Sequence, residues 1–186
     1  CIANCTSSVK AKGVTADVTL KNVSYKVDGA KTDIKTVRLE YTKATGTKQW
    51  TSIDIDGSKF NDGSEDITIP ANGDKYLLED TNYAYRVTFI PSDSKYEVIT
   101  TEEKTFKTTF AEITAEISKP KVNVTDEAVE VVVDDVRAYF DGIHITEYEN
   151  LVYGVFYTRV DDINWEGYIA NYANGSMSIT FPIDYF

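Results

Sequence analysis

The feature of this sequence that most constrains its fold is an internal repeat. Three blocks of the first half recur in the same order in the second half. They pair residues 18–23 with 131–136, 37–43 with 153–159, and 67–70 with 179–182. Each copy of the middle block leads to a tryptophan, and each copy of the last block ends in proline. The repeat therefore predicts one structural unit present twice, in a chain of 186 residues with room for two domains of about 100 residues each.

Short segments in which apolar and polar residues alternate predict strands throughout the first copy. We predict strands over 14–27, 34–43, 49–55, 67–70, 83–90 and 104–108, with Gly, Asn and Asp turns between them. No stretch of a dozen residues carries the apolar stripe of a helix. The predicted fold class is all-β, with each copy folded as a sandwich of two sheets.

One run of the first copy resembles a known family. The run 77–85, LLEDTNYAY, is similar to the E–F turn and strand F tyrosine of fibronectin type III and related immunoglobulin-like domains. Trp50 opens a strand as in that family, whereas the strand B tryptophan is absent and Leu20 stands near its place. The resemblance implies two tandem fibronectin-III-like β-sandwiches, over 9–110 and 111–186. Residues 1–8 are small and polar and are predicted to be a tether.

The second copy is shorter than the first. In the first copy the residues after Pro70 supply the E–F turn and two more strands, whereas only four residues follow Pro182. The second sandwich is therefore expected to lack its last two strands. Three explanations stay open: the natural chain continues past Phe186, the insertion 138–150 closes the sheet, or a neighbouring molecule donates strands as in pilus subunits.

Acidic residues are concentrated in the second copy. Up to Phe110 there are 15 Lys and Arg against 16 Asp and Glu, and from Ala111 onward there are 4 against 14. The second copy thus accounts for −10 of the net charge of −11. Such a surface repels phosphate backbones, so no nucleic acid is expected as a partner.

The two cysteines, Cys1 and Cys5, lie at the start of the chain. A chain that begins with cysteine is typical of processed bacterial lipoproteins, in which residue 1 carries the lipid. A local Cys1–Cys5 disulfide and an arbitrary starting point are the alternatives. No apolar run approaches the roughly 20 residues that a spanning helix needs, so a lipid on Cys1 is the expected membrane attachment. The chain resembles the modular surface lipoproteins of Bacteroidetes-type bacteria, which implies an extracellular, outer-membrane location.

Groups suited to catalysis are sparse. His144 is the only histidine, and it is expected at an exposed position of an alternating strand with no catalytic motif beside it. The sequence therefore does not predict an enzyme.

One loop of the first copy is rich in oxygen ligands of the kind that calcium prefers, with carboxylates at Asp54, Asp56, Asp62 and Asp66. The spacing differs from an EF-hand, because Lys59 stands at the position of the required glycine. A solvated turn is the alternative. The acidic pairs at 134–135 and 161–162 are weaker candidates of the same kind.

The second copy has more aromatic residues than a small sandwich can bury. The candidate ligand-binding residues among them are Tyr139, Tyr148, Tyr168 and Tyr172. Exposed rings beside carboxylates are suited to stacking on sugars, and tyrosine is also enriched at protein interfaces. Trp165 is expected in the core, as the counterpart of Trp50.

These features predict a non-enzymatic cell-surface protein for binding, adhesion or scaffolding. The acidic, aromatic second copy is expected to meet a protein or a glycan, and the nearly neutral first copy to act as a spacer. The alternative is a pilin-like subunit of a surface filament, a homo-polymer assembled by strand donation.

Overall fold

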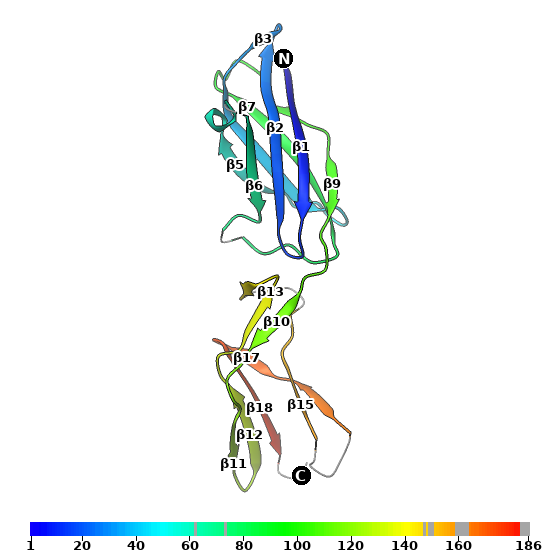
Figure 1. The fold of residues 1–186 in the computed structure, drawn as a ribbon, viewed down its shortest axis with the longest axis vertical. Helices are drawn as coiled ribbons and strands as arrows, with labels where there is room; N and C mark the ends of the chain where they lie inside the picture. Colours follow the sequence, from blue (N-terminus) through cyan, green and yellow to red (C-terminus); the bar gives the residue numbers. More distant parts are fainter. Residues whose placement is uncertain (62, 73, 147, 149–150, 159–163, 183–186) are drawn as a thin grey trace. The chain divides into compact units, whose positions relative to one another are not determined.

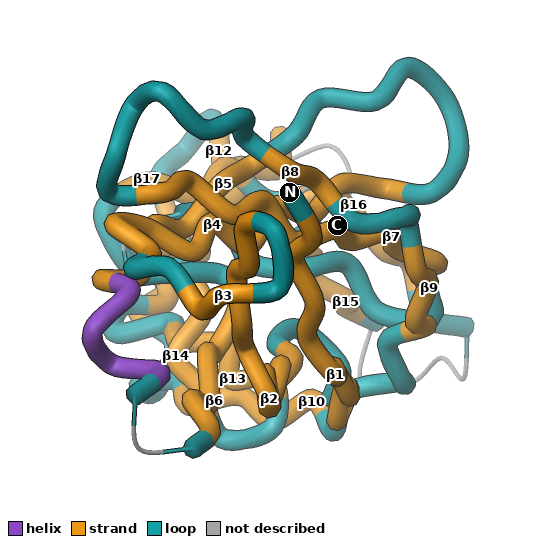
Figure 2. The backbone as a smooth tube through the Cα atoms, turned by 90° about the horizontal axis from the view of Figure 1, so that it is seen from above, coloured by secondary structure: helices purple, strands orange, loops and turns teal. Residues whose placement is uncertain are grey.

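The chain forms two compact units, Cys1–Ala111 (unit 1) and Glu112–Phe186 (unit 2). A computed structural model describes all residues except 62, 73, 147, 149–150, 159–163 and 183–186. The described elements are strands (Figure 1), apart from one 3-10 turn, η1 (Gly57–Phe60), drawn in purple in Figure 2. The prediction of an all-β chain is confirmed.

Unit 1 is a sandwich of two antiparallel sheets. In the first sheet β2 (Ala16–Val27) pairs with β1 (Ile2–Ala11) along one edge, and with β3 (Ala30–Lys31) and β6 (Ser64–Ile69) along the other. The second sheet has the order β5 (Thr51–Asp56), β4 (Ile34–Lys43), β7 (Asn82–Pro91), and β8 (Ile99–Thr100) and β9 (Lys104–Lys107) both pair with the far edge of β7.

The six strands predicted for the first copy are present as β2, β4, β5, β6, β7 and β9, each within a few residues of the expected bounds. The tether predicted over 1–8 is wrong, because Ile2–Ala11 is a ten-residue strand paired along β2. Every second residue of β1 is half-buried. Most of those residues are small, including Ala3, Cys5 and Ser7, so the alternation does not appear as a change of polarity.

The core of unit 1 is built from the inward faces of both sheets. Val18 and Leu20 of β2 pack in one cluster with Leu39 of β4 and with Val87 and Phe89 of β7. All five are at most 1% exposed. Burying each such side chain contributes about 1.5–3 kcal/mol, so these contacts hold the two sheets together.

The loop that leads into β7 is fixed by side-chain hydrogen bonds. The backbone N–H of Leu78 donates to the Tyr83 hydroxyl at 2.9 Å. The buried Thr108 hydroxyl donates to the Leu78 carbonyl at 2.6 Å and accepts from the Thr81 N–H at 2.9 Å. The turn before β7 is thereby tied to the strand end after β9.

Unit 2 contains three antiparallel sheets among its described residues. The first has the order β11 (Lys121–Val124), β12 (Ala128–Val133), β18 (Ser176–Pro182), β17 (Asn171–Ala173). The second has the order β10 (Ile113–Glu116), β13 (Arg137–Phe140), β14 (Ile143–Ile145). The third is the pair β15 (Gly154–Tyr157) and β16 (Glu166–Ile169).

The strand register of the first sheet reproduces the sequence repeat. In unit 1 Val18 of β2 lies opposite Ile67 of β6. Their repeat counterparts, Val131 of β12 and Ile179 of β18, also lie opposite each other. β11, β12 and β18 are therefore the counterparts of β1, β2 and β6.

The same relation holds between the second sheet of unit 1 and the β15–β16 pair of unit 2. Leu39 of β4 lies opposite Ile53 of β5, and their counterparts Val155 of β15 and Tyr168 of β16 lie opposite each other. β15 and β16 are thus the counterparts of β4 and β5. Among the described residues unit 2 has no counterpart of β7 or β9.

In the part that the structure describes, the insertion over 138–150 does not pair with β15 or β16. Its strands β13 and β14 form a hairpin that pairs with β10. The explanation in which the insertion completes the second sandwich is therefore wrong for those residues.

Candidate functional site

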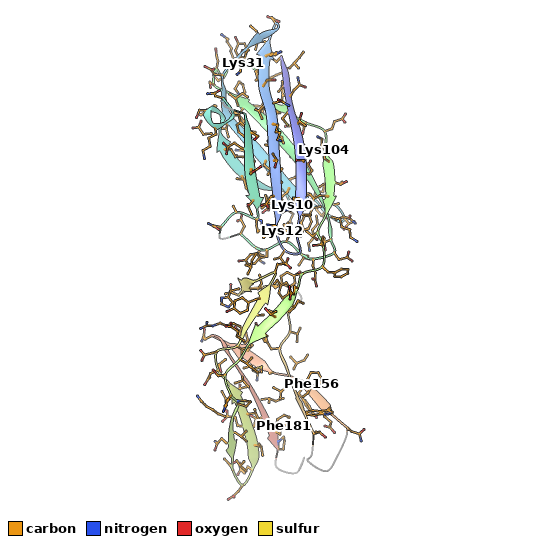
Figure 3. All side chains as sticks on the ribbon, viewed as in Figure 1. Lys10, Lys12, Lys31, Lys104, Phe156 and Phe181 are labelled. Atoms are coloured by element: carbon orange, nitrogen blue, oxygen red, sulfur yellow. The ribbon has the colours of Figure 1, made fainter. Side chains whose placement is uncertain are left out.

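Three large apolar side chains are exposed on the β15–β16 pair or directly beside it. They are Phe156, Trp165 and Ile169, which are 72%, 66% and 79% exposed. Since side chains alternate between the two faces of a strand, Phe156 and Ile169 lie opposite to the inward-facing Val155 and Tyr168. Trp165 directly precedes β16 and has the parity of Ile169 in sequence. We call these three residues the outer patch; Phe156 is labelled in Figure 3.

Phe156 lies against the backbone of Gly167, its partner across the pair. A Cβ atom placed on Gly167 would lie 2.5 Å from a ring atom of Phe156. The glycine therefore gives the ring room to lie across β16, and this position widens the apolar part of the face.

In unit 1 the residue corresponding to Trp165 is covered. Trp50 is half-buried, and the guanidinium of Arg86 on β7 lies over its ring. Arg86 also donates two hydrogen bonds of 3.1 Å to the carboxylate of Glu40. The expectation that Trp165 is a core residue is wrong. Both tryptophans lie outside the sandwich core, and the described part of unit 2 has no counterpart of the strand that carries Arg86.

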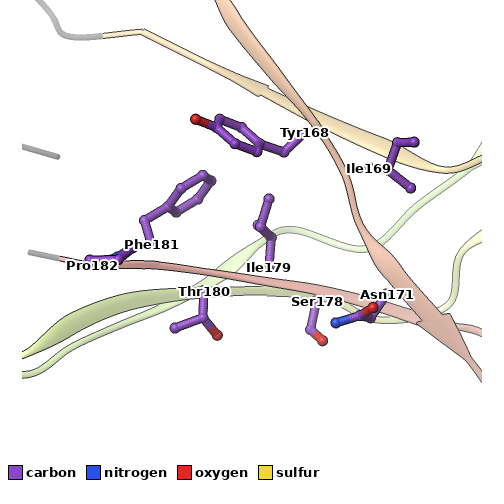
Figure 4. Close-up of a pocket in the computed structure, with 8 residues that line it drawn as sticks. All are labelled: Tyr168, Ile169, Asn171, Ser178, Ile179, Thr180, Phe181 and Pro182. Carbon is purple, nitrogen blue, oxygen red and sulfur yellow. The ribbon is translucent and has the colours of Figure 1, made fainter.

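A pocket of about 310 Å³ lies between β16, β17 and β18 (Figure 4). The Tyr168 ring meets Phe181 edge-on at 5.6 Å between ring centres. The lining residues are Tyr168, Ile169, Asn171, Ser178, Ile179, Thr180, Phe181 and Pro182. The side chains of Tyr168, Ile179 and Phe181 lie on one side of β18, whereas those of Ser178 and Thr180 point to its other face (Figure 4). The wall beside Tyr168 is therefore aromatic and apolar.

Tyr139 lies on β13, in a different sheet from the strands that line this pocket. Its hydroxyl donates to Glu116 at 3.0 Å, and its ring centre is 5.4 Å from that of His144. His144 is an exposed residue of β14, as the alternation predicted.

The remaining two candidate tyrosines have different partners again. Tyr148 packs on Phe140 with 4.7 Å between ring centres. Tyr172 of β17 stacks on Tyr153 at 4.1 Å. Burial, together with the hydrogen bond and charge of Tyr172, raises the pKa of Tyr153 to about 12. The four predicted tyrosines thus lie against four different partners, and their role in ligand binding stays a prediction.

Sequence reasoning missed Phe156 and Ile169. The signal that could have found them is in the repeat itself. Glu40 and Asp54 are the unit 1 counterparts of Phe156 and Ile169, and both are outward-facing charged residues. Replacement of a charge by a large apolar side chain on the outward face of a strand is unexpected unless something covers that face.

The described carboxylates of the proposed calcium loop have separate partners. Asp54 accepts two hydrogen bonds from Arg38, at 2.6 and 2.9 Å, which hold the pKa of Asp54 below its ordinary value. Asp56 accepts from the Ser58 N–H at 2.9 Å. Asp66 lies on β6, in the other sheet, and accepts from Thr19 at 2.6 Å. Asp62 lies outside the described residues, so the calcium site stays a prediction.

Of the two acidic pairs of the second copy, the pair 134–135 lies within the described residues. Asp134 accepts hydrogen bonds from Lys121 at 2.5 Å and from Ser176 at 3.0 Å, and these lower its pKa. Asp135 accepts from Ser118 at 2.9 Å. The pair 161–162 lies outside the described residues. Within the described part of the chain no three His, Cys, Asp or Glu side chains gather as metal ligands.

Both cysteines are free thiols. Cys1 is exposed at the start of β1, whereas Cys5 packs against the core of unit 1, and burial raises the pKa of the Cys5 thiol. No helix in the described residues is long and apolar enough to cross a membrane.

Comparison with known proteins adds no assignment. No protein family matches the chain, and no curated protein has a recognisably similar sequence.

Proposed function

We propose that the chain is a non-enzymatic binding protein of the cell surface, in which unit 2 contacts a partner protein and unit 1 acts as a spacer. The observation that carries this proposal is the outer patch of Phe156, Trp165 and Ile169. Single exposed apolar residues are ordinary, whereas adjacent large ones mark interaction surfaces, and aromatic residues are enriched there.

The distribution of charge supports the same division of roles. From Ala111 onward there are 4 Lys and Arg against 14 Asp and Glu, while the preceding residues are nearly balanced. A domain with such an excess of one sign of charge favours partners that carry the opposite charge and speeds their encounter. The favoured partner is a protein with a basic rim around an apolar centre, and nucleic acid is disfavoured.

The fold of unit 1 supports a fibronectin-III-like assignment. The order of its strands in the two sheets is that of such a sandwich. The hydrogen bond between the Tyr83 hydroxyl and the Leu78 backbone corresponds to the tyrosine corner found near strand F. Domains of this kind commonly display other binding units. The spacer role proposed for unit 1 is based on its likeness in fold to such domains.

Photo-crosslinking tests the protein partner. A benzoylphenylalanine at position 165 is compared with one at Lys31, an exposed residue of unit 1. We expect protein adducts on intact cells from position 165 and few from position 31. Equal yields from the two positions would contradict a partner at the outer patch.

A glycan is the second candidate partner, favoured by the pocket beside Tyr168. Its aromatic wall, in which the Tyr168 ring meets Phe181, is suited to stacking on the apolar face of a sugar. Soluble polysaccharides are to be tested with Tyr168→Ala, which removes the wall, and with Tyr172→Ala, whose ring stacks on Tyr153 instead. Binding lost only in Tyr168→Ala would support the glycan, and unchanged binding would remove this pocket from the proposal.

The proposed surface location includes a lipid on Cys1. The exposed position of this residue at the end of β1 is compatible with acylation. Intact-mass measurement of the protein from its native source tests this. Acyl chains on residue 1 are the expected result, and an unmodified Cys1 would contradict the lipoprotein proposal.

A filament subunit is the alternative function, and the unpaired edge of β15 favours it. Among the described residues β16 is the only strand that pairs with β15. Subunits joined by donated strands would give ladders of multimers that resist denaturant. A discrete monomer under all conditions would exclude this alternative.

A further inference from the structure

Within the described residues no strand pairs with β15 along the edge that faces away from β16, and this edge carries backbone hydrogen-bonding groups. The Ala170 N–H donates to the Tyr153 carbonyl at 3.0 Å, so these two residues form a hydrogen-bonded pair. Pairs of this kind alternate with non-hydrogen-bonded ones along an antiparallel ladder. The backbone groups of Gly154 and Phe156 therefore point away from β16. Such an edge is a template for another strand.

In unit 1 the corresponding edge is occupied by β7, which pairs with β4 from end to end. Arg86 lies opposite Glu40, with Tyr85 and Val87 on either side of it. Tyr85 and Val87 are buried in the core, while Arg86 lies outside and stacks on Trp50. β7 thus combines apolar side chains on one face with a cation on the other.

Inward-facing residues of unit 2 are more exposed than their counterparts in unit 1. Val131 is half-buried, whereas its counterpart Val18 is fully buried. Val122 is 60% exposed, whereas its counterpart Val9 packs against the core of unit 1. These residues line the sheet that the inward side chains of a strand on β15 would face.

We propose that the edge of β15 binds an extended segment of a partner protein with the chemistry of β7. Apolar side chains at alternate positions would face inward, and an arginine between them would stack on Trp165. The acid excess of unit 2 favours this cation. Phe156 replaces Glu40 at the facing position, so the arginine would meet a second ring. This inference rests on the proposed function, because it names the segment that the partner of unit 2 presents by strand addition.

The probe is a peptide of residues 82–91, NYAYRVTFIP, with a fluorescent label at its N-terminus. It is titrated into the full chain carrying Trp50→Phe, so that Trp165 is the only tryptophan of the chain. We expect saturable binding by anisotropy and a blue shift of the Trp165 emission. A peptide with Arg86→Glu should bind at least tenfold more weakly, and one with the same composition in scrambled order should not bind.

Two measurements on the chain test the edge itself. Phe156→Pro removes an N–H that points away from β16. We expect it to bind the peptide about tenfold more weakly than Phe156→Ala does, which corresponds to the loss of one hydrogen bond. Amide exchange requires no substitution. The amides of Gly154 and Phe156 should become protected when the peptide is added, which keeps the test valid if Phe156→Pro unfolds unit 2.

The outcomes separate this inference from the proposed function. Absence of peptide binding, or binding without protection of Gly154 and Phe156, overturns strand addition. If the crosslinker at position 165 still captures a protein, the proposed function stands and only the strand inference fails. If the captured protein is a second copy of this chain, the named occupant is wrong and the filament alternative gains.

Discussion

The guanidinium carbon of Arg86 lies 4.1 Å from the centre of the Trp50 ring, and the same group holds the carboxylate of Glu40. One side chain of β7 thereby joins β4 to the residue that precedes β5. A cation over an aromatic ring contributes about 0.5–2 kcal/mol, depending on how far the pair is removed from water. In unit 2 the counterpart, Trp165, is exposed because the described residues provide no such cation.

Arg86→Met should destabilise unit 1. The side chain is only 30% exposed, and its loss removes both hydrogen bonds that it donates to Glu40, which is 14% exposed. We expect a loss of about 1.5–3 kcal/mol in the free energy of unfolding, the range for hydrogen bonds to charged groups. Arg38→Met is the matched control, since its partner Asp54 is half-exposed and such pairs contribute about 0–1 kcal/mol. Urea unfolding followed by fluorescence, in a Trp165→Phe background so that Trp50 is the only tryptophan, measures both, and equal losses would contradict this assignment.

The two counterparts Val18 and Val131 should differ in their response to truncation. Val18→Ala removes two methyl groups from a fully buried site, at about 0.8 kcal/mol for each buried carbon plus a cavity term, so we expect about 2 kcal/mol or more. Val131 is half-buried, and Val131→Ala should cost under about 1 kcal/mol. Denaturant unfolding gives both values when unit 1 is followed by Trp50 in a Trp165→Phe background and unit 2 by Trp165 in a Trp50→Phe background. A larger loss at Val131 would show that unit 2 is covered on this face.

Glu40 should make unit 1 sensitive to acid. Burial alone would raise the pKa of Glu40, but hydrogen bonds from Arg86 and Thr88 outweigh burial and hold the pKa below its ordinary value of 4.5. A carboxyl group with a lowered pKa stabilises the fold above that ordinary value, and the contribution is lost as the pH falls through the folded pKa. Glu40→Gln should therefore be less stable than the wild type at pH 7, and the difference should shrink below pH 4.5. Melting temperatures measured from pH 7 to 2 check this, and a constant difference would rule it out.

Two glycines should respond differently to alanine. A Cβ on Gly57 would lie 1.9 Å from the carbonyl oxygen of Ile34, a backbone atom that cannot move aside cheaply. Gly57→Ala should cost about 1–3 kcal/mol of the free energy of unfolding, the range of an overpacked core site. At Gly167 the nearest atoms belong to the exposed Phe156 ring, which can swing away, so Gly167→Ala should cost under about 1 kcal/mol. Thermal unfolding of both variants tests the contrast.

The repeat made the strand pairing predictable, because blocks in one order with preserved alternation specify the same register. Val18 and Ile67 are paired as their counterparts Val131 and Ile179 are. The strand β1 was not predictable from polarity, since its inward residues are mostly small. The burial of Trp165 was inferred from Trp50, and the error lay in taking Trp50 for a core residue.

The candidate site was only partly predictable. Tyr168 could be chosen from composition, and it does line a pocket. The exposure of Phe156 and Ile169 depends on which strand covers β15, and strand neighbours far apart in sequence do not appear in local patterns. Comparing each outward residue with its repeat counterpart supplies that information, because Glu40 and Asp54 are charged where these two are apolar.

The pairing of β1 along β2 affects how unit 1 would carry a mechanical load. Cys1 lies at one end of β1, and at the other end the Thr109 N–H donates to the Lys12 carbonyl at 3.1 Å, close to where unit 1 ends. If Cys1 carries the proposed lipid, the two points at which unit 1 is held are separated by a strand of about 34 Å. Tension between an anchor at Cys1 and unit 2 would run parallel to β1 and shear its ladder with β2. Hydrogen bonds loaded in shear resist the force together. A flexible tether over residues 1–8 would instead have extended before unit 1 carried any load.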